Sequence, residues 1–300
     1  MRTLANVIRR NLKLFFKDKG MFFSALITPM ILLVLYATFL AKVYRDSFSS
    51  ALPENFQIAE ELMNGTVASQ LISALLAVTC VTVSFCANLL MIQDKANGSI
   101  RDFTVTPVRR STLAAGYYIS SAASTLIVTF SAFAVCLGYL ATQGWYMSLT
   151  DVLLSAADVL LLTLFGTALS SCINYFLHTN GQASAVGTII SAGYGFVCGA
   201  YMPIASFGEG LQKVLSFFPG TYGTCLLKNH MMRGVFAEME NVGFPSQDVE
   251  SIKDGIDVNL YFFGKQVSLS AMLAVMIGAI LLFTGLFVLF HMLRKSAKAR

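Results

Sequence analysis

The sequence predicts an all-α integral membrane protein with six transmembrane helices, and two observations lead to that prediction. Of 300 residues, 56% are hydrophobic and only 12% are charged, whereas ordinary soluble domains are roughly a quarter charged. The charges are also clustered, so that long segments carry none, namely residues 21–41, 67–92, 111–150, 159–208 and 266–293. Backbone groups in hydrocarbon must be paired within their own segment, so segments of this length are expected to be helices.

Two of these segments are too long for one span, because a helix needs only about 20 residues to cross a bilayer. A turn at residues 144–146, Gly-Trp-Tyr, divides one segment, and Asn180-Gly181 divides the other. The expected spans are residues 22–41, 67–92, 112–140, 151–174, 183–201 and 268–292. We expect residues 1–300 to form a single transmembrane domain.

The distribution of Lys and Arg predicts the orientation. Six basic residues lie in residues 1–20, four between the second and third spans, and four in the C-terminal tail. These fourteen share their side with three acidic residues, while the other side holds seven basic residues and most of the acids. Because basic residues near span ends resist translocation, both termini are expected in the cytoplasm and the chain in the cell membrane. The net charge of +5 then suits anionic lipid better than nucleic acid.

Before the first span, apolar residues recur at helical spacing with basic residues between them. The apolar set is Leu4, Ile8, Leu12, Phe15 and Phe16. This pattern predicts an amphipathic helix over residues 1–20 that lies on the inner membrane surface. The alternative is a basic leader that only directs topology.

The connection between the second and third spans, residues 93–110, is short and charged. Ser99 can cap a helical turn with Asp102 three positions later, and Pro107 ends that turn. Such an element, held between two membrane helices, can fit a groove on a soluble partner and transmit its movement. The alternative is a solvated turn whose arginines only fix topology.

Two stretches resemble motifs of type-2 ABC transporter permeases. Residues 98–110, in which Gly-Ser-Ile is followed by Thr-Val-Thr-Pro-Val-Arg-Arg, resemble the family's cytoplasmic motif. Residues 202–222, which begin Met-Pro-Ile and end Phe-Pro-Gly-Thr-Tyr, are similar to its outer-leaflet segment. With six spans and a basic leader, the resemblance covers nearly the whole chain.

The resemblance implies that residues 97–110 form a coupling helix docked on a separate ATP-hydrolysing subunit. The contact residues it implies are Gly98, Ser99, Arg101, Asp102, Phe103, Thr106, Pro107, Arg109 and Arg110. The family often has acidic residues before this glycine and just after the aliphatic residue. Here those neighbourhoods contain Gln93, Asp94 and Lys95, and then Arg101 before Asp102, so the contact is expected to use different charges.

The resemblance also implies a second permease subunit, identical or closely related, and a direction of export. The sequence has no Gly-x4-Gly-Lys-Ser/Thr phosphate loop, so ATP and Mg are expected on the partner, with no cofactor and no enzyme activity in this chain. An apolar, weakly polar pathway suits an amphipathic drug, a peptide or a lipid-linked molecule.

The outer-leaflet segment is expected to begin a region over residues 202–265. A short half-inserted helix around residues 211–218 would cap the outer mouth, and residues 223–265 would form a small external lobe. The residues expected at the outer gate are Pro203, Phe218, Pro219 and Tyr222.

Two helix faces carry small or polar residues. On the second span, Ser73, Cys80, Ser84 and Asn88 share one face, which either lines a pathway or packs against another helix. On the fifth span, a small-xxx-small ridge is expected to serve helix packing or a dimer contact, with a pathway lining as the alternative. Its members are Gly187, Ser191, Gly195 and Gly199.

Asp158 is the one acidic residue expected within a span, so the main alternative function is an ion-coupled secondary transporter that uses this carboxylate. A hydrogen bond to a neighbouring helix is the plainer explanation. An intramembrane hydrolase is disfavoured, because His291 is the only histidine in a predicted span. No metal site is expected, and no disulfide framework is expected, because five of the six cysteines lie within spans.

Overall fold

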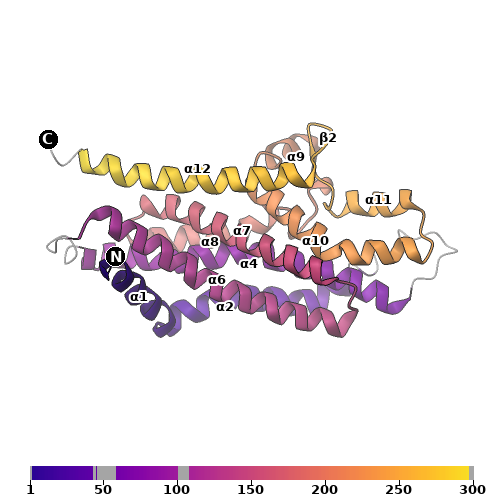
Figure 1. The fold of residues 1–300 in the computed structure, drawn as a ribbon, viewed down its shortest axis with the longest axis horizontal. Coiled ribbons are helices and arrows are strands. Elements are labelled where there is room, and N and C mark those ends of the chain that lie inside the picture. Colours follow the sequence, from indigo (N-terminus) through magenta and orange to yellow (C-terminus); the bar gives the residue numbers. More distant parts are fainter. Residues whose placement is uncertain (1, 43–44, 46–58, 101–107, 297–300) are drawn as a thin grey trace.

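The computed structural model describes residues 2–42, 45, 59–100 and 108–296, and it is built almost entirely of helices (Figure 1). The helices are α1 (Arg2–Lys17), α2 (Lys19–Leu35), the π-helix η1 (Tyr36–Leu40), α4 (Glu60–Ala96), α6 (Arg110–Gln143), α7 (Leu149–Tyr175), α8 (Asn180–Val197), the 3-10 helix η2 (Ile204–Ser206), α9 (Glu209–Leu215), α10 (Pro219–Asn241), α11 (Ser246–Gly255) and α12 (Leu269–Ser296). Strands β1 (Tyr261–Phe262) and β2 (Lys265–Gln266) form a short antiparallel hairpin.

Helix α4 is the centre of the bundle. Helices α2, α6, α7, α8 and α10 all pack against it, and almost every side chain from Leu62 to Ile92 is buried. Such a position agrees with a sequence that is apolar or weakly polar on every face. Helix α12 packs on α7 and α10 along one side of the molecule, while α1 packs on α6 along the other (Figure 1).

Among the described residues, four helices are long and apolar enough to cross a membrane: Glu60–Ala96, Ser111–Gln143, Leu149–Tyr175 and Leu269–His291. They overlap four of the six predicted spans, and the all-α class is confirmed. The other two predicted spans, 22–41 and 183–201, also fall on helices, but these α-helices are shorter than the four above. Helix α2 has 17 residues before it passes into η1, and α8 has 18.

The two turns predicted to divide the long apolar segments are present. Helix α6 ends at Gln143 and α7 begins at Leu149, while α8 begins at Asn180 after the end of α7 at Tyr175. Each new helix begins at a capping box, with Ser148 and Asp151 at α7 and with Thr179 and Gln182 at α8. In such a box the two side chains satisfy backbone N–H groups that the first helical turn leaves unpaired.

Residues 223–241, which were predicted to begin a small external lobe, form most of helix α10. Helix α10 runs unbroken from Pro219 to Asn241 and packs against α4, α7 and α12, with Leu227 and Met231 fully buried. Its polar residues interrupt the apolar pattern in the sequence and so suggested a solvated segment. Beyond Asn241 lie α11 and the hairpin, and the predicted short helix before α10 is α9.

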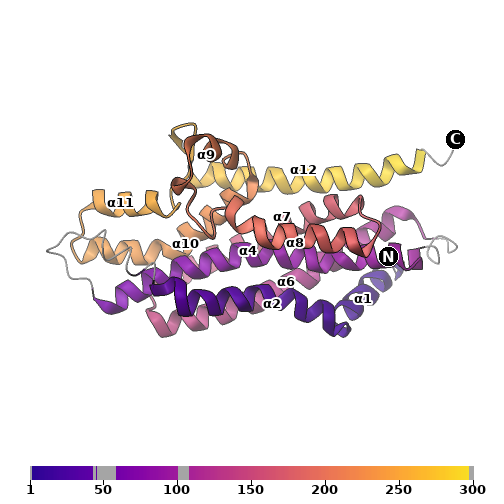
Figure 2. The ribbon, with the colours of Figure 1, turned by 180° about the vertical axis from the view of Figure 1, so that it is seen from behind.

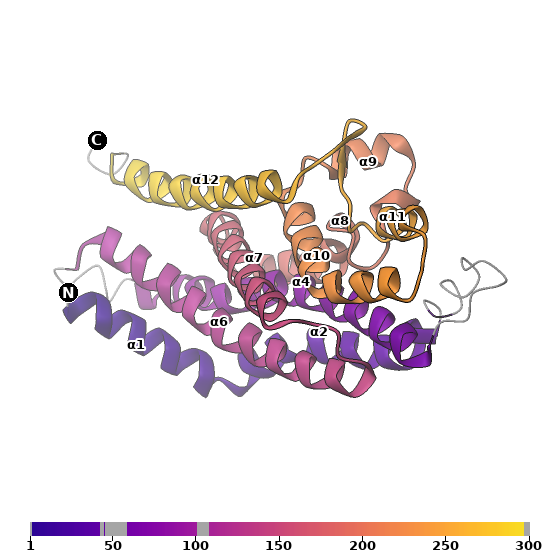
Figure 3. The same cartoon turned by 45° about the vertical axis from the view of Figure 1, so that its right-hand side comes forward.

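The bundle has two distinct ends (Figure 3). Helix α1, the C-terminal end of α12 and the end of α4 lie together at one end, which we name the terminal end. Helix α11 and the turn between α6 and α7 lie at the other, which we name the distal end. Figure 2 shows the same arrangement from behind, with α2 running alongside α4.

Candidate functional site

The terminal end contains a junction of charged residues built on Asp94 in the last turns of α4. The buried Asp94 carboxylate accepts hydrogen bonds from both terminal nitrogens of Arg10, at 2.6 and 3.0 Å, and one from the Tyr117 hydroxyl at 2.5 Å. Arg10 belongs to α1 and Tyr117 to α6. A bidentate guanidinium–carboxylate pair is both strong and directional, so Asp94 fixes α1 and α6 to the end of α4.

The next residue, Lys95, joins α4 to a fourth helix. Its ammonium group donates to the backbone carbonyls of Asn174, Tyr175 and Leu177, at 3.0, 2.9 and 3.1 Å. These carbonyls lie at the C-terminal end of α7 or just beyond it, at the negative end of the helix dipole, and the Asn174 carbonyl also accepts the Leu177 N–H at 3.3 Å. Lys95 therefore caps α7, and two adjacent side chains of α4 connect four helices.

Helix α1 is docked on α6 through close packing as well as charge. Asn11 donates to the Ser120 hydroxyl at 3.2 Å. A methyl group on Gly116 would lie 2.5 Å from a carbon of Val7, so only glycine permits this approach. The side chains that α1 buries are Val7, Asn11 and Phe15. Of the apolar residues predicted to face the membrane, Phe15 is buried within the protein and Phe16 is exposed, and the face of α1 that packs on α6 includes the polar Asn11.

The predicted coupling residues frame the connection that follows this junction. Gly98 directly follows the C-cap of α4 at Asn97 and has a left-handed φ of 78°, as glycines at this position commonly do. Ser99 is half-buried, Arg109 is exposed at the N-cap of α6, and Arg110 begins that helix. The other predicted members lie outside the described residues: Arg101, Asp102, Phe103, Thr106 and Pro107.

The polar stripe of α4 lies in the contact with α7. Asn88 donates to the hydroxyls of Ser170 and Ser171, at 2.5 and 3.0 Å, and Ser84 lies 3.4 Å from the Thr167 hydroxyl. Cys80 donates to the Val159 carbonyl at 3.8 Å, and the buried Ser73 donates to Gln70 of its own helix. This geometry favours helix packing over a pathway lining for the stripe.

The four small residues predicted to form a ridge lie on α8 or just after it, and the structure divides them into two groups. A methyl group on Gly195 would clash with the Tyr201 ring, and Gly199 has a φ of 71° and approaches Asp257. The Tyr201 hydroxyl also donates to the Ser191 carbonyl at 3.4 Å. These three positions therefore accommodate the chain as it turns back after α8. Gly187 faces open space.

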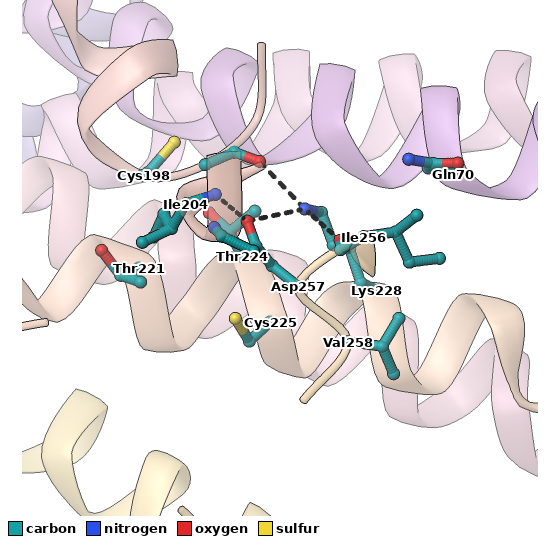
Figure 4. A network of polar contacts seen from close by, with 12 residues as sticks. Gln70, Cys198, Ile204, Thr221, Thr224, Cys225, Lys228, Ile256, Asp257 and Val258 are labelled. Carbon is teal, nitrogen blue, oxygen red and sulfur yellow. Dashed lines mark hydrogen bonds and ion pairs between the residues drawn. The ribbon is translucent and has the colours of Figure 1, made fainter. Parts of the chain in front are cut away.

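At the distal end, the buried Lys228 of α10 gathers two loops (Figure 4). Its ammonium group donates to the carbonyls of Gly199 and Ile256, both at 2.9 Å, and lies 3.9 Å from the Asp257 carboxylate. That carboxylate in turn accepts the backbone N–H groups of Ile204, at 2.5 Å, and Ala205, at 3.2 Å. Burial raises the pKa of Asp257, and Lys228 opposes the rise. We name these contacts the distal clasp.

The residues predicted at the outer gate lie just before η2 and around the start of α10. Pro203 precedes η2, and Pro219 is the first residue of α10. The Phe218 ring packs edge-on against Phe165 and Tyr194. The Tyr222 hydroxyl donates to the Ser216 carbonyl at 2.6 Å. The Lys228–Asp257 pair itself was missed by the sequence reasoning, although a lysine flanked by apolar helix residues is a signal for a buried cation.

Two further ion pairs join α7 to α10. Asp158, which the sequence presents without a partner, lies 2.5 Å from His230 Nδ1, and Asp151 lies 2.5 Å from Arg233 Nε. The aspartates are buried, His230 is largely buried and Arg233 is half-exposed. Within the described part of the chain, no cluster of three His, Cys, Asp or Glu side chains is arranged to hold a metal ion.

Comparison with known families decides the identity of this bundle. The family model described as ABC-2 type transporter matches residues 3–231, which span α1 to most of α10. The chain belongs to the ABC-2 type transporter family. It is therefore a multi-pass membrane permease, a transport subunit that is not itself catalytic, of a family that generally works with an ATP-binding subunit. No curated protein matches this ABC-2 permease.

Proposed function

We propose that this permease is the membrane subunit of an ATP-driven exporter, and that the junction at the terminal end carries the movement of a separate ATPase into the bundle. The observation that supports the proposal is the Asp94–Lys95 pair. These residues join α4 to α1, α6 and α7 immediately before the connection that begins at Asn97. ATP and Mg bind to the partner.

Force applied to the connection of residues 97–110 reaches four helices at once. Displacement of the end of α4 moves α1 through Arg10, α6 through Tyr117 and α7 through the carbonyls bound by Lys95. Charge-assisted hydrogen bonds resist sliding better than apolar contacts because they are directional. Helix α4 has 37 residues, so it extends that movement to the distal end.

In the proposed topology the terminal end is cytoplasmic and the distal end is outside. Fourteen of the 21 basic residues then lie on the cytoplasmic side. The six spans are the four long apolar helices together with α2–η1 and α8. With 18 residues α8 is about 27 Å long, close to the hydrocarbon thickness of a bilayer.

A second permease subunit completes the proposed transporter. Gly187 faces open space on α8, and Ile189 on the same helix is exposed. A small residue beside exposed apolar side chains suits a helix contact with another subunit. The proposed cargo is an amphipathic drug, a peptide or a lipid-linked molecule.

The class is tested by purifying the tagged permease from its native membrane in a mild detergent. We expect an ATP-hydrolysing chain with a phosphate loop to co-purify, and hydrolysis by the complex to be inhibited by vanadate. Absence of any such chain, together with equal cargo movement in nucleotide-free liposomes, contradicts the proposal.

The role of the junction is tested by Asp94→Asn in that complex. The substitution removes the charge that holds Arg10 but keeps the size of the side chain. We expect ATP hydrolysis to continue while cargo moved per ATP falls about tenfold, because α1 and α6 no longer follow α4. The control is Glu240→Gln, which removes an exposed carboxylate at the distal end. An unchanged transport ratio in Asp94→Asn excludes the junction as the route.

The Asp158–His230 pair keeps a second candidate, an ion-coupled secondary transporter, in consideration. A buried acid beside a histidine in a membrane protein is an arrangement suited to proton transfer. For that function, a proton ionophore abolishes transport, vanadate has no effect, and Asp158→Asn abolishes transport without altering the assembly.

A further inference from the structure

A cavity opens at the distal end between α2–η1, α4 and α6. Its volume is about 410 Å³. Lys42 and Arg45 line it from the segment after η1, Asn64 and Leu71 from α4, and Gln143 from α6. Helices α2 and α6 both pack on α4, and the residues of α4 form one wall of the cavity.

The lining of the cavity is positively charged at one wall and apolar at its floor. Lys42 and Arg45 are its only charged lining residues among those described. Glu60 pairs with Arg45 at 3.0 Å, but it is largely exposed and lies outside the lining. The floor is formed by Val67, Ala68 and Leu71. A ligand suited to this cavity therefore combines an anionic group with an apolar part.

An exposed apolar stripe on α2 leads toward the same cavity. Ile27, Ile31 and Val34 are each more than half exposed, and their spacings of four and three residues place them on one helix face. Thr38 and Lys42, which follow the stripe along the chain, both line the cavity. An apolar stripe that ends in a lysine at the end of a span matches the profile of a phospholipid, with the acyl chain along the helix and the headgroup at its end.

The π-helix is a second, independent observation at this place. Residues Tyr36–Leu40 form η1, and Thr38 within it lines the cavity. Short π-helical turns are rare and occur frequently at functional sites. Here the wider turn lies between the apolar stripe and the two cations.

We propose that this cavity binds the phosphate headgroup of an anionic membrane phospholipid, with Lys42 and Arg45 as its charged contacts and the acyl chains along the exposed face of α2. This site is separate from the junction at the terminal end and does not depend on the direction of transport. In the proposed topology it selects a lipid of the outer leaflet.

The test is native mass spectrometry of the full-length permease in detergent, with added phosphatidylglycerol or phosphatidylcholine of identical acyl chains. We expect selective retention of phosphatidylglycerol, and a loss in affinity of about fivefold for each cation removed in Lys42→Gln and Arg45→Gln. Lys265→Gln is the matched control, because it removes one exposed positive charge from the distal hairpin. Lys42→Gln leaves the Arg45–Glu60 pair intact, so its result stands even when Arg45→Gln unfolds.

A further variant separates shape from charge. Ala41→Phe places a ring in the cavity without changing its charge, and we expect it to weaken phosphatidylglycerol binding while leaving thermal stability within a few degrees of the wild type. Equal retention of the two lipids, unchanged affinity in Lys42→Gln, or competition by millimolar inorganic phosphate as effective as that by lipid each overturns the proposal. The last outcome assigns the cations to free phosphate.

Discussion

The two ends of the bundle hold their charged groups in different ways. At the terminal end, Asp94 and Lys95 connect helices to helices, and the Arg10 side chain remains 33% exposed. At the distal end, Lys228 and Asp257 are only 2% and 5% exposed, and they connect one helix to two loops. Only the Arg10 side of the junction is open to water, because the Asp94 side chain is 8% exposed, whereas both charges of the distal clasp lie within the protein.

This difference teaches what each end can do. Bonds between rigid helices pass a displacement from one helix to the next, and the partly exposed Arg10 keeps its contact with water while they do so. Bonds that gather loops around a buried cation hold those loops in one arrangement, because separation leaves a charge without its partners in a low-dielectric interior. The terminal end is suited to transmit movement, and the distal end to keep its shape.

The variant with the largest expected effect on this difference between the ends is Lys228→Met. The variant leaves Asp257 buried without its cation, so we expect a loss of about 3–5 kcal/mol in the free energy of unfolding. Thermal unfolding in detergent measures the loss. Cys198 and Cys225 lie beside the clasp and are each 1% exposed (Figure 4), so thiol labelling at these residues, located by mass spectrometry, should increase.

The double variant Lys228→Met with Asp257→Asn serves as the control for this prediction. With both charges removed, we expect recovery of part of the lost stability, since an unpaired charge accounts for most of the loss. A single variant as stable as the wild type, with both thiols still protected, contradicts the role given to the clasp.

A smaller effect is expected at the terminal end from Gly98→Ala. The alanine meets no atom within 4 Å, so the loss comes only from forcing a side chain into a φ of 78°. We expect about 1 kcal/mol of destabilisation. The matched control is Gly138→Ala, which also has open space but lies within α6. There the same change stabilises by up to about 1 kcal/mol, so equal shifts in melting temperature contradict the strain at Gly98.

Much of the fold was predictable because lipid imposes simple rules. The long apolar helices and the two turns that separate them follow from uncharged length and from turn-forming residues such as Gly144 and Asn180. Helix α10 was not predictable in this way. The mixture of Asp, Glu, Gly and Asn from residue 223 onward predicted a lobe, and only the tertiary structure shows the partners of Lys228 and His230.

The candidate sites were also predictable only in part, because the sequence does not show which distant residues contact each other. The connection at residues 97–110 was found from its motif, but the importance of Asp94 depends on Arg10 and Tyr117, which are 84 and 23 residues away in sequence. Asp158 was recognised as unusual, whereas its partner His230 lies 72 residues away. Pairing across such separations is set by helix packing, and a single sequence carries no record of it.

The smallest expected effect is the pH dependence that Asp257 gives to the stability of the distal clasp. Burial raises the pKa of Asp257 above its usual value of 3.8, opposed by Lys228 and by the N–H groups of Ile204 and Ala205. The folded state then binds this proton more tightly than the unfolded state, so the contribution of Asp257 to stability falls as pH rises from about 4 through the raised pKa. We expect wild-type protein to gain stability relative to Asp257→Asn on acidification through this window, by on the order of 1 kcal/mol or less. Melting temperatures of the two proteins across that pH range measure the effect. If the two melting temperatures differ by the same amount at every pH in this range, the Asp257 carboxylate stays charged, and the effect of Lys228 on its pKa outweighs that of burial.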